Sequence, residues 1–425
     1  MGPHPGDDEL RRRALDVLVR NHRDGYTVPA LGLYPYQWCW DSGPIALGWA
    51  AAGRWDDAWG ELARLFSAQW ESGMVPHIVF WHEDDGYFPG PDVWATGHTP
   101  PTTGLTQPPL PVSAAARLFT GDPDRARASA AFRSLWPGLV AWLSWIERAR
   151  RGPHGAVVIV HPWESGMDNS PSWDEPLAPV PAVTHKRIER RDVATVSARQ
   201  RPSQHEYRQY LGIVDALRAA RWDTERQPAD SPFAVEDPAF TAITARAGAD
   251  LASVADAAGL DGQEPARLAA AAHAGLEALW DEELGWYRPY DTRARRPVGP
   301  VTSTGMVALW AGVGPARLSR MLARLDVWAE SLPCPLATSD PGDPSFDPIR
   351  YWRGPAWVLV NWLVADGLAG AGLADRASTL RAATRALVEQ GFSEYYDPRS
   401  GAGIGGQGFS WSAALTLAWL TEERP

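Results

Sequence analysis

The chain has 425 residues, and its 51 acidic against 40 basic side chains give a formal net charge of -11. A phosphate backbone would repel such a chain overall, so we expect no nucleic-acid partner. Its 23 Trp, 11 Tyr and 10 Phe exclude an intrinsically disordered protein. No segment approaches the ~18 uncharged apolar residues of a membrane span, so we expect no membrane partner.

The first twenty residues and the cysteines indicate a cytoplasmic protein. Acids and arginines occupy the positions where a secretory signal would have an apolar run. Cys39 and Cys334 are too few for a disulfide scaffold or a zinc site of thiolates. The ten histidines are scattered, and no metal, phosphate-loop or dinucleotide motif occurs. We therefore expect neither a metal nor a cofactor.

Helical periodicity dominates the chain. In the first predicted helix, Leu10, Ala14 and Leu18 recur at the spacing of one helix face. Strand signals are few, and the best is at 157–160. An all-α fold follows, built as a closed arrangement of helical hairpins. The predicted helices cover 9–21, 43–52, 55–70, 111–119, 128–150, 203–221, 236–257, 264–281, 302–311, 314–329, 354–370, 374–391 and 409–422.

We expect residues 1–425 to form one domain with long functional loops. The excursion at about 171–202 is a candidate lid. Its basic run at 185–191 indicates a solvated loop or a local carboxylate-binding patch. The long segments between helices carry many of the aromatic residues, and loops of this length usually serve a function. These segments are 33–42, 75–94, 161–174 and 345–357.

The tryptophans divide into two groups. Those on predicted helices indicate core packing: Trp136, Trp142, Trp145 and Trp362. Those beside polar neighbours in loops indicate a sugar site, because sugar rings offer apolar C–H faces to flat aromatic walls. These are Trp38, Trp40, Trp163, Trp173 and Trp352.

Hydrolysis of a glycoside needs two carboxyl groups, one as an acid and the other as a base or nucleophile. The aromatic-rich segments offer Asp41, Glu164, Asp168, Asp174, Asp347 and Glu394. The pattern does not choose among them, because helix caps and turns explain most loop aspartates. The glycine-rich segment 401–411 indicates a turn in a binding loop.

The motifs LYPYQWCWDS, MVPHIVF, WESGMDNSPSWD, YWRGPAW, FSEYYDP and GGQGFSW occur in this order along the chain. Together they resemble glycoside hydrolase family 63, and most closely its bacterial branch that hydrolyses mannosylglycerate and glucosylglycerate. The resemblance runs from about residue 9 to 422. It implies an (α/α)6 toroid and an inverting mechanism without an organic cofactor.

The resemblance also implies roles for individual residues. Asp168 would be the general acid and Glu394 the general base, with their carboxyl groups about 6.5–9.5 Å apart. Asp168 would need a raised pKa, which desolvation beside Trp163 or Trp173 would provide. The remaining expected substrate contacts are Tyr34, Trp38, Trp40, Asp41, Tyr87, Gln107, Trp163, Tyr351, Trp352, Trp357 and Gln407. Gln407 either contacts substrate or replaces a carboxylate, and an amide cannot act as the base at neutral pH.

The carboxylate of a glycerate group calls for a cation. Arg201 and Tyr207 match the family's glycerate-binding pair, and a guanidinium can hold a carboxylate with two hydrogen bonds. The same segment also has the pattern of a helix start, with Ser203 as N-cap and Glu206 completing a capping box. The two interpretations are compatible.

Several alternatives remain open. The chain could be an α-glucosidase acting on a neutral disaccharide or oligosaccharide, or a non-catalytic sugar-binding protein on the same fold. A sugar epimerase is disfavoured, because that chemistry usually needs histidine bases. The sequence does not decide between mannose and glucose. It also leaves open whether the chain forms a homo-oligomer.

Overall fold

The computed structural model describes residues 6–84, 86–184, 188–334 and 336–421. Within these residues an inner ring of helices closes on itself, since each helix contacts the next and the last contacts the first. The order of contact is α2 (Cys39–Ala51), α5 (Leu110–Gly121), α11 (Pro238–Ala258), α14 (Ala308–Ala311), α16 (Val358–Gly370) and α18 (Ser410–Leu415). The chain has the predicted (α/α)6 fold.

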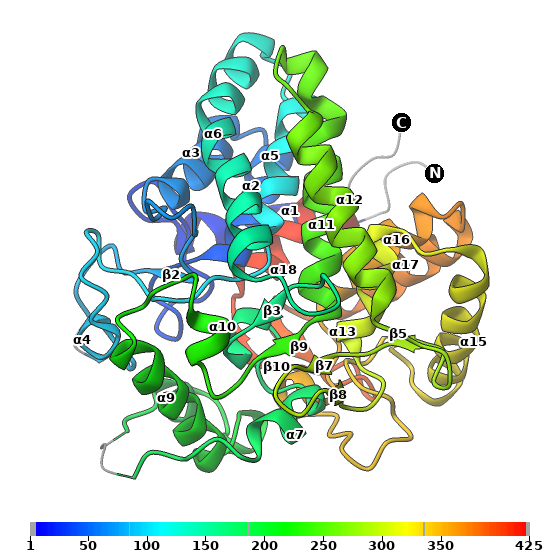
Figure 1. Ribbon diagram of the computed structural model, residues 1–425. Coiled ribbons are helices and arrows are strands. Elements are labelled where there is room, and N and C mark those ends of the chain that lie inside the picture. Colours follow the sequence, from blue (N-terminus) through cyan, green and yellow to red (C-terminus); the bar gives the residue numbers. More distant parts are fainter. Residues whose placement is uncertain (1–5, 85, 185–187, 335, 422–425) are drawn as a thin grey trace.

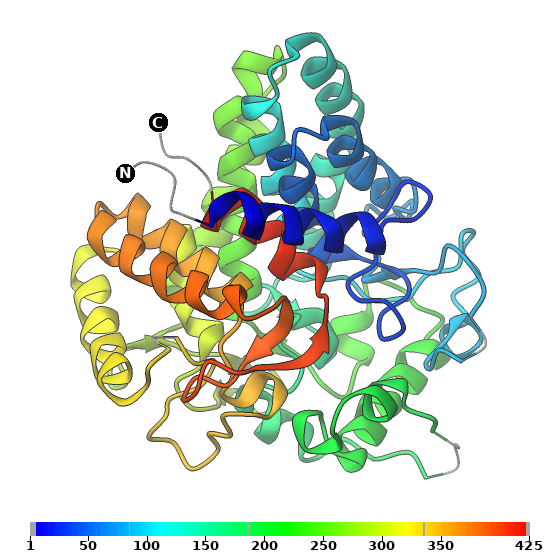
Figure 2. The ribbon, with the colours of Figure 1, turned by 180° about the vertical axis from the view of Figure 1, so that it is seen from behind.

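An outer layer of helices surrounds this ring (Figures 1 and 2). Five inner helices each pack against an outer helix: α2 against α3 (Trp55–Phe66), α5 against α6 (Arg125–Ala149), α11 against α12 (Gln263–Ala278), α16 against α17 (Ala374–Glu389), and α18 against α1 (Asp7–Asn21). The outer helix α15 (Pro315–Ser331) follows α14 along the chain. Nearly every residue of α16 is buried, whereas α15 buries only Met321, Leu325 and Trp328. A helix that is apolar on all sides belongs inside, and an amphipathic one covers it.

One further long helix, α9 (Gln204–Ala219), and several short elements fill the connections. The short elements are α4 (Pro91–Trp94), η1 (Pro162–Ser165), η2 (Pro171–Trp173), α7 (Asp174–Leu177), α8 (Arg191–Thr195), η3 (Ala198–Gln200), α10 (Gln227–Asp230), α13 (Ser303–Met306), η4 (Tyr351–Arg353) and the π-helical η5 (Thr416–Leu420). In Figure 1, α7 and α9 gather at the lower end of the ring, whereas the turns between α5 and α6 and between α11 and α12 project at the top.

The strands are short and antiparallel. β1 (Gln37–Trp38) pairs with β2 (Ile78–Val79), and β5 (Trp280–Asp281) pairs with β6 (Trp286–Tyr287). β3 (Val158–Ile159), β4 (Val235–Glu236), β7 (Tyr290–Asp291) and β8 (Arg296–Pro297) form one small sheet. β9 (Ser393–Tyr396) pairs with β10 (Gly403–Gln407), with Gly403 opposite Tyr396 and an irregular register between Ile404 and Gln407.

Three local expectations need correction. The helix predicted at 43–52 begins earlier, at Cys39, and includes Pro44 in its interior. Trp40 and Asp41 therefore lie on the helix. The helix predicted at 302–311 is divided into α13 and α14 at Val307. The glycine-rich segment predicted as a turn contains strand β10.

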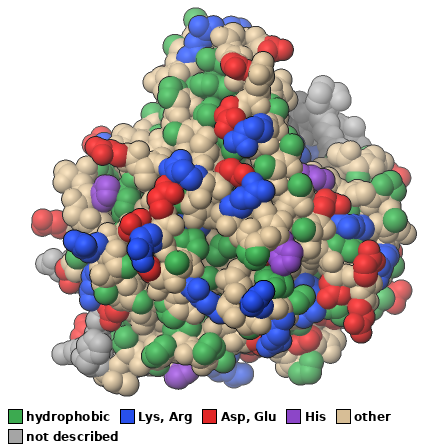
Figure 3. Space-filling view, in the orientation of Figure 1, with side chains coloured by type: hydrophobic (Ala, Val, Ile, Leu, Met, Phe, Trp, Pro, Cys, Tyr) green, Lys and Arg blue, Asp and Glu red, His purple; other side chains and the backbone are tan. Residues whose placement is uncertain are grey.

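Charged side chains of both signs are interspersed over the face shown in Figure 3. No helix in the described ranges is long and apolar enough to span a bilayer. Cys39 and Cys334 are both buried and unbridged. The described part of the basic run is paired: Arg190 binds Asp192 and Arg191 binds Asp84, whereas 185–187 lie outside the described residues.

The ring depends on close approach between inner helices. A Cβ atom on Gly48 of α2 would lie 2.5 Å from the Cα of Ala414 on α18. We therefore expect Gly48→Ala to lower the free energy of unfolding by about 1–3 kcal/mol through overpacking, measured by urea denaturation. Gly60→Ala on outer helix α3 is the matched control, because its Cβ would meet no atom within 4 Å. Equal stability of the two variants would contradict the account.

Candidate active site

One cavity collects residues from all four aromatic-rich segments and from β9. It is lined by Pro29, Leu33, Tyr34, Trp38, Trp40, Asp41, His77, Ile78, Tyr87, Phe88, Pro89, Trp94, Gln107, Trp163, Gly166, Asp168, Arg191, Asp192, Arg201, Pro202, Tyr207, Tyr351, Trp352, Glu394, Phe409 and Trp411. Both predicted catalytic carboxyl groups are in this set. So are the expected substrate contacts, with the exceptions of Trp357 and Gln407.

Trp357 lies behind the cavity wall, and Gln407 lies outside it. Trp357 stacks on Trp352 with ring centroids 3.7 Å apart, and thus supports the wall from behind. Gln407 is exposed on β10, where its side-chain oxygen accepts a hydrogen bond from Ser393. Its neighbour Gly406 instead directs its backbone N–H to Glu394.

The aromatic wall contains unsatisfied donors. Trp352 lies in a stack with Trp357 and Tyr395, and Trp40 packs obliquely against Trp352. Among the described residues, no acceptor is found for the buried indole N–H groups of Trp38, Trp352 and Trp411, nor a partner for either ring nitrogen of His77. A buried polar group without a partner costs about 1–3 kcal/mol.

The segment that carries Asp168 is held rigidly. Tyr210 donates a 2.6 Å hydrogen bond to the Asp168 carbonyl, and Trp173 donates to the preceding carbonyl of Met167. Gly166 has φ of 71°, and a Cβ there would lie 2.6 Å from the Trp40 ring. Glycine at this position allows the acid-bearing loop to approach the aromatic wall closely.

Burial sets the protonation of Asp168. Desolvation raises the pKa of its carboxyl group to about 8, against a smaller opposing effect of Arg201. Burial also raises the pKa of Asp41 well above its usual range, and the negative charge of Glu394 adds to this effect. At neutral pH the cavity therefore presents Asp168 as a neutral acid that can donate a proton.

The other candidate carboxyl groups have structural partners. Glu164 is fully buried, pairs with Arg150 and accepts the backbone N–H groups of Thr106 and Val160. Asp174 pairs with Arg353 at the edge of a second cavity, to which Trp173 also belongs. Asp347 caps a turn by accepting the N–H of Ile349. None of these three lines the aromatic cavity.

Glu394 is buried and fully engaged. Its Oε1 accepts hydrogen bonds from Tyr34 Oη at 2.9 Å and Arg201 Nη1 at 3.1 Å. Its Oε2 accepts from Arg201 Nη2 at 2.5 Å and from the Gly406 N–H at 2.8 Å. The Arg201 side chain is 1% exposed, and the ring of Tyr351 lies 4.8 Å from its guanidinium carbon. The sequence predicted both residues in one site, but not this ion pair.

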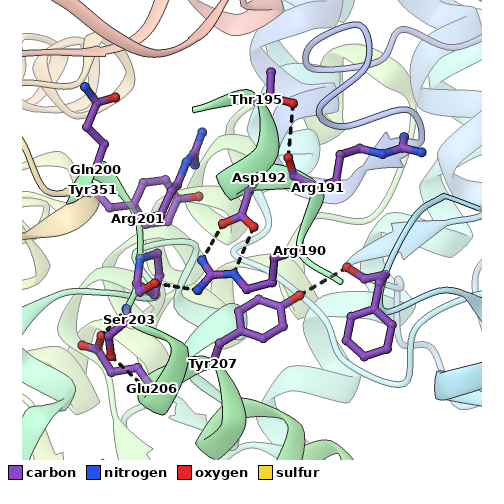
Figure 4. Close-up of polar contacts among 12 residues, drawn as sticks. Arg190, Arg191, Asp192, Thr195, Gln200, Arg201, Ser203, Glu206, Tyr207 and Tyr351 are labelled. Atoms are coloured by element: carbon purple, nitrogen blue, oxygen red, sulfur yellow. Dashed lines mark hydrogen bonds and ion pairs between the residues drawn. The ribbon is translucent and has the colours of Figure 1, made fainter. Parts of the chain in front are cut away.

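The segment before α9 and the first turn of α9 make further polar contacts beside the cavity (Figure 4). Ser203 and Glu206 form the predicted capping box. Tyr207 donates to the carbonyl of Phe88, and the guanidinium of Arg190 lies 4.4 Å from the Tyr207 ring centroid. Arg190 also makes two hydrogen bonds to Asp192.

The model of the mannosylglycerate hydrolase MGH1-like glycoside hydrolase domain matches residues 34–412. The chain belongs to this family of glycoside hydrolases. It is 46% identical to a mannosylglycerate hydrolase of Thermus thermophilus, over 96% of this chain and 99% of the relative. It is 35% identical to a glucosylglycerate hydrolase of Mycolicibacterium hassiacum, over 97% and 98% of the two chains.

Solved structures agree with this family membership. The mannosylglycerate hydrolase of glycoside hydrolase family 63 from Thermus thermophilus, in complex with Tris and D-glycerate, matches with a TM-score of 0.93 and 47% identity, over 96% of this chain and 99% of that one. The resemblance to family 63 is thereby confirmed. A neutral trehalase of Saccharomyces cerevisiae shares the fold, with a TM-score of 0.58 and 18% identity over 94% and 74% of the chains.

Sequence reasoning missed several residues of the cavity. His77 and Trp411 lie within MVPHIVF and GGQGFSW, two motifs that carried the resemblance, so their motifs were the available signal. Arg191 ends the basic run that the sequence marks as a solvated loop or a carboxylate-binding patch, and Asp192 follows it in the candidate lid. No spacing rule marks them as cavity residues.

The protonation of Asp168 can be measured directly. We expect its carboxyl group to be neutral below pH 8 and to ionise as the pH rises through about 8. Infrared difference spectra between wild type and Asp168→Asn should show a protonated-carboxyl band that disappears over this range. An Asp168 carboxylate already ionised at pH 6 would contradict the account.

Proposed function

We propose that the chain is an inverting α-glycosidase that hydrolyses 2-O-α-mannosyl-D-glycerate, 2-O-α-glucosyl-D-glycerate or both. The observation that carries this proposal is the combination of groups in one aromatic cavity: the neutral acid Asp168, the carboxylate Glu394 and the buried cation Arg201. The names of the relatives support the same substrate class.

In this mechanism Asp168 donates its proton to the glycosidic oxygen as the bond to the anomeric carbon breaks. Glu394 takes a proton from a water molecule whose oxygen attacks the opposite face of that carbon. The products are free glycerate and a sugar of inverted configuration. An inverting pair leaves room for the water, with about 6.5–9.5 Å between the carboxyl groups.

The glycerate carboxylate would bind Arg201, with Tyr207 and Tyr87 beside it. All three side chains line the cavity, and a guanidinium can hold a carboxylate with paired hydrogen bonds. The sugar ring would lie against Trp40 and Trp352, whose partner Trp357 stiffens the wall. Mannose and glucose differ only at C2, and relatives named for either sugar match this chain end to end.

The excursion at about 171–202 contributes Arg191, Asp192 and Arg201 to the cavity, which supports the proposal that it acts as a lid. A cytoplasmic location and homo-oligomeric assembly stay predictions.

Substitution of the two catalytic carboxyl groups tests the mechanism. Asp168→Asn and Glu394→Gln should each lower kcat on glycosylglycerates by about 10²–10⁴-fold, the usual contribution of a general acid or base. Asp174→Asn is the matched control, because Asp174 lies outside the aromatic cavity and pairs with Arg353. Near wild-type turnover by Asp168→Asn, with the fold verified by circular dichroism, would refute the assignment.

A pair of substrates separates the proposal from an α-glucosidase of neutral substrates. Mannosylglycerate and 2-O-α-mannosylglycerol differ only in the carboxylate. We expect kcat/KM to favour the charged substrate by roughly ten- to hundredfold, since charge-assisted hydrogen bonds contribute about 1.5–3 kcal/mol. The same comparison with the glucosyl pair gives the sugar preference. Equal rates within each pair would favour the neutral-substrate alternative, and sugar binding without turnover would favour a sugar-binding protein.

A further inference from the structure

The hydrogen-bonding capacity of Glu394 is exhausted in this structure. An ionised carboxylate offers about four lone-pair positions, two on each oxygen. Tyr34 and Arg201 occupy those of Oε1, at 2.9 and 3.1 Å. Arg201 and Gly406 occupy those of Oε2, at 2.5 and 2.8 Å. No position remains at which a water molecule could donate its proton, so a base at Glu394 requires one of these donors to leave.

Arg201 is the donor best able to leave. The Gly406 N–H belongs to the backbone of β10, and the Tyr34 ring is packed edge-on against Trp38 and Phe409. Arg201 supplies two of the four bonds from a long side chain. Its Nη1 also donates to Tyr34 Oη at 2.8 Å, and its buried Nε has no acceptor within the described ranges of the chain.

The surroundings of Arg201 allow it to exchange one carboxylate for another. Its guanidinium carbon lies 4.8, 5.8 and 5.9 Å from the ring centroids of Tyr351, Tyr395 and Tyr34. These rings attract a cation whichever anion it binds. The neighbouring arginines have carboxylate partners of their own: Arg190 binds Asp192 and Arg191 binds Asp84.

We propose that the carboxylate of the substrate draws Arg201 away from Glu394 and thereby frees the base to accept a proton from water. The inference rests on the proposed function and deepens it. The glycerate carboxylate is then a requirement for the chemical step as well as a binding group. A glycoside without a carboxylate next to the glycosidic oxygen enters the cavity but leaves Glu394 saturated.

No covalent bond changes in the exchange itself, since Arg201 replaces one carboxylate partner with another. Hydrolysis then proceeds as above. The opposing interpretation is that Arg201 holds Glu394 in its working position, in which case removal of Arg201 slows the hydrolysis of every substrate.

Activation by a separate carboxylate tests the exchange. α-Mannosyl fluoride and α-glucosyl fluoride carry no carboxylate, and 3-hydroxypropanoate is glycerate without the hydroxyl whose place the fluoride takes. We expect 3-hydroxypropanoate to raise kcat for fluoride hydrolysis saturably, by at least about tenfold and at most by the about 10²–10⁴-fold attributed to a general base. Propane-1,3-diol, the uncharged matched control, should have no effect. Inhibition or no change with 3-hydroxypropanoate would overturn the proposal.

Variants give a second, independent test. In Arg201→Met, fluoride hydrolysis without any additive should reach about the activated wild-type rate and no longer respond to 3-hydroxypropanoate, while glycosylglycerate hydrolysis falls. Arg353→Met removes a guanidinium that binds Asp174 rather than Glu394, and it should retain the wild-type response. A folded Arg201→Met variant that hydrolyses the fluorides more slowly than wild type would show that Arg201 positions the base.

The two proposals fail in different ways. If neither glycosylglycerate is hydrolysed, the proposed function is wrong. If a glycosylglycerate is hydrolysed but 3-hydroxypropanoate does not activate fluoride hydrolysis, the proposed function holds and the exchange is wrong. The wild-type measurement needs no variant, so it stands even if Arg201→Met does not fold.

Discussion

The burial of carboxyl groups in a cavity walled by aromatic rings is the constraint on which this site depends. Removing a carboxylate from water is costly, and a protein offsets the cost by neutralising the group or by pairing it. The cavity uses both solutions. Asp168 has no ion-pair partner among the described residues and is held as the neutral acid, whereas Glu394 is paired with Arg201. The position of the Arg201 guanidinium thus determines which carboxyl group serves as the acid and which as the base.

The ring of helices supplies the rigidity that this arrangement needs. Inner helices approach so closely that Gly48 leaves no room for a Cβ, and Asp41 is presented from the first turn of the same helix. The segments between helices then meet at one end of the ring. Asp168 lies on one such segment and Glu394 on the β9–β10 hairpin, so the two carboxyl groups are carried by separate, independently braced pieces of backbone.

Much of the fold and of the candidate site could be predicted from the sequence, because the sequence patterns that indicate them are local. Helical periodicity located nearly all the long helices, and the aromatic segments that line the cavity were recognisable by composition. What the sequence could not provide were contacts between distant side chains. Arg201 and Glu394 are 193 residues apart, and no spacing rule joins them. The register of β10 could not be predicted from the sequence either. This register determines that Gly406 rather than Gln407 donates a hydrogen bond to Glu394.

The stereochemistry of hydrolysis tests the acid–base assignment most directly. Proton NMR can follow the anomeric signal of the sugar first released from α-mannosylglycerate and α-glucosylglycerate, before mutarotation equilibrates the two anomers. The account predicts the β-anomer first, because Glu394 delivers water to the face opposite Asp168. Initial release of the α-anomer would contradict it, since retention requires a carboxylate that attacks the anomeric carbon itself.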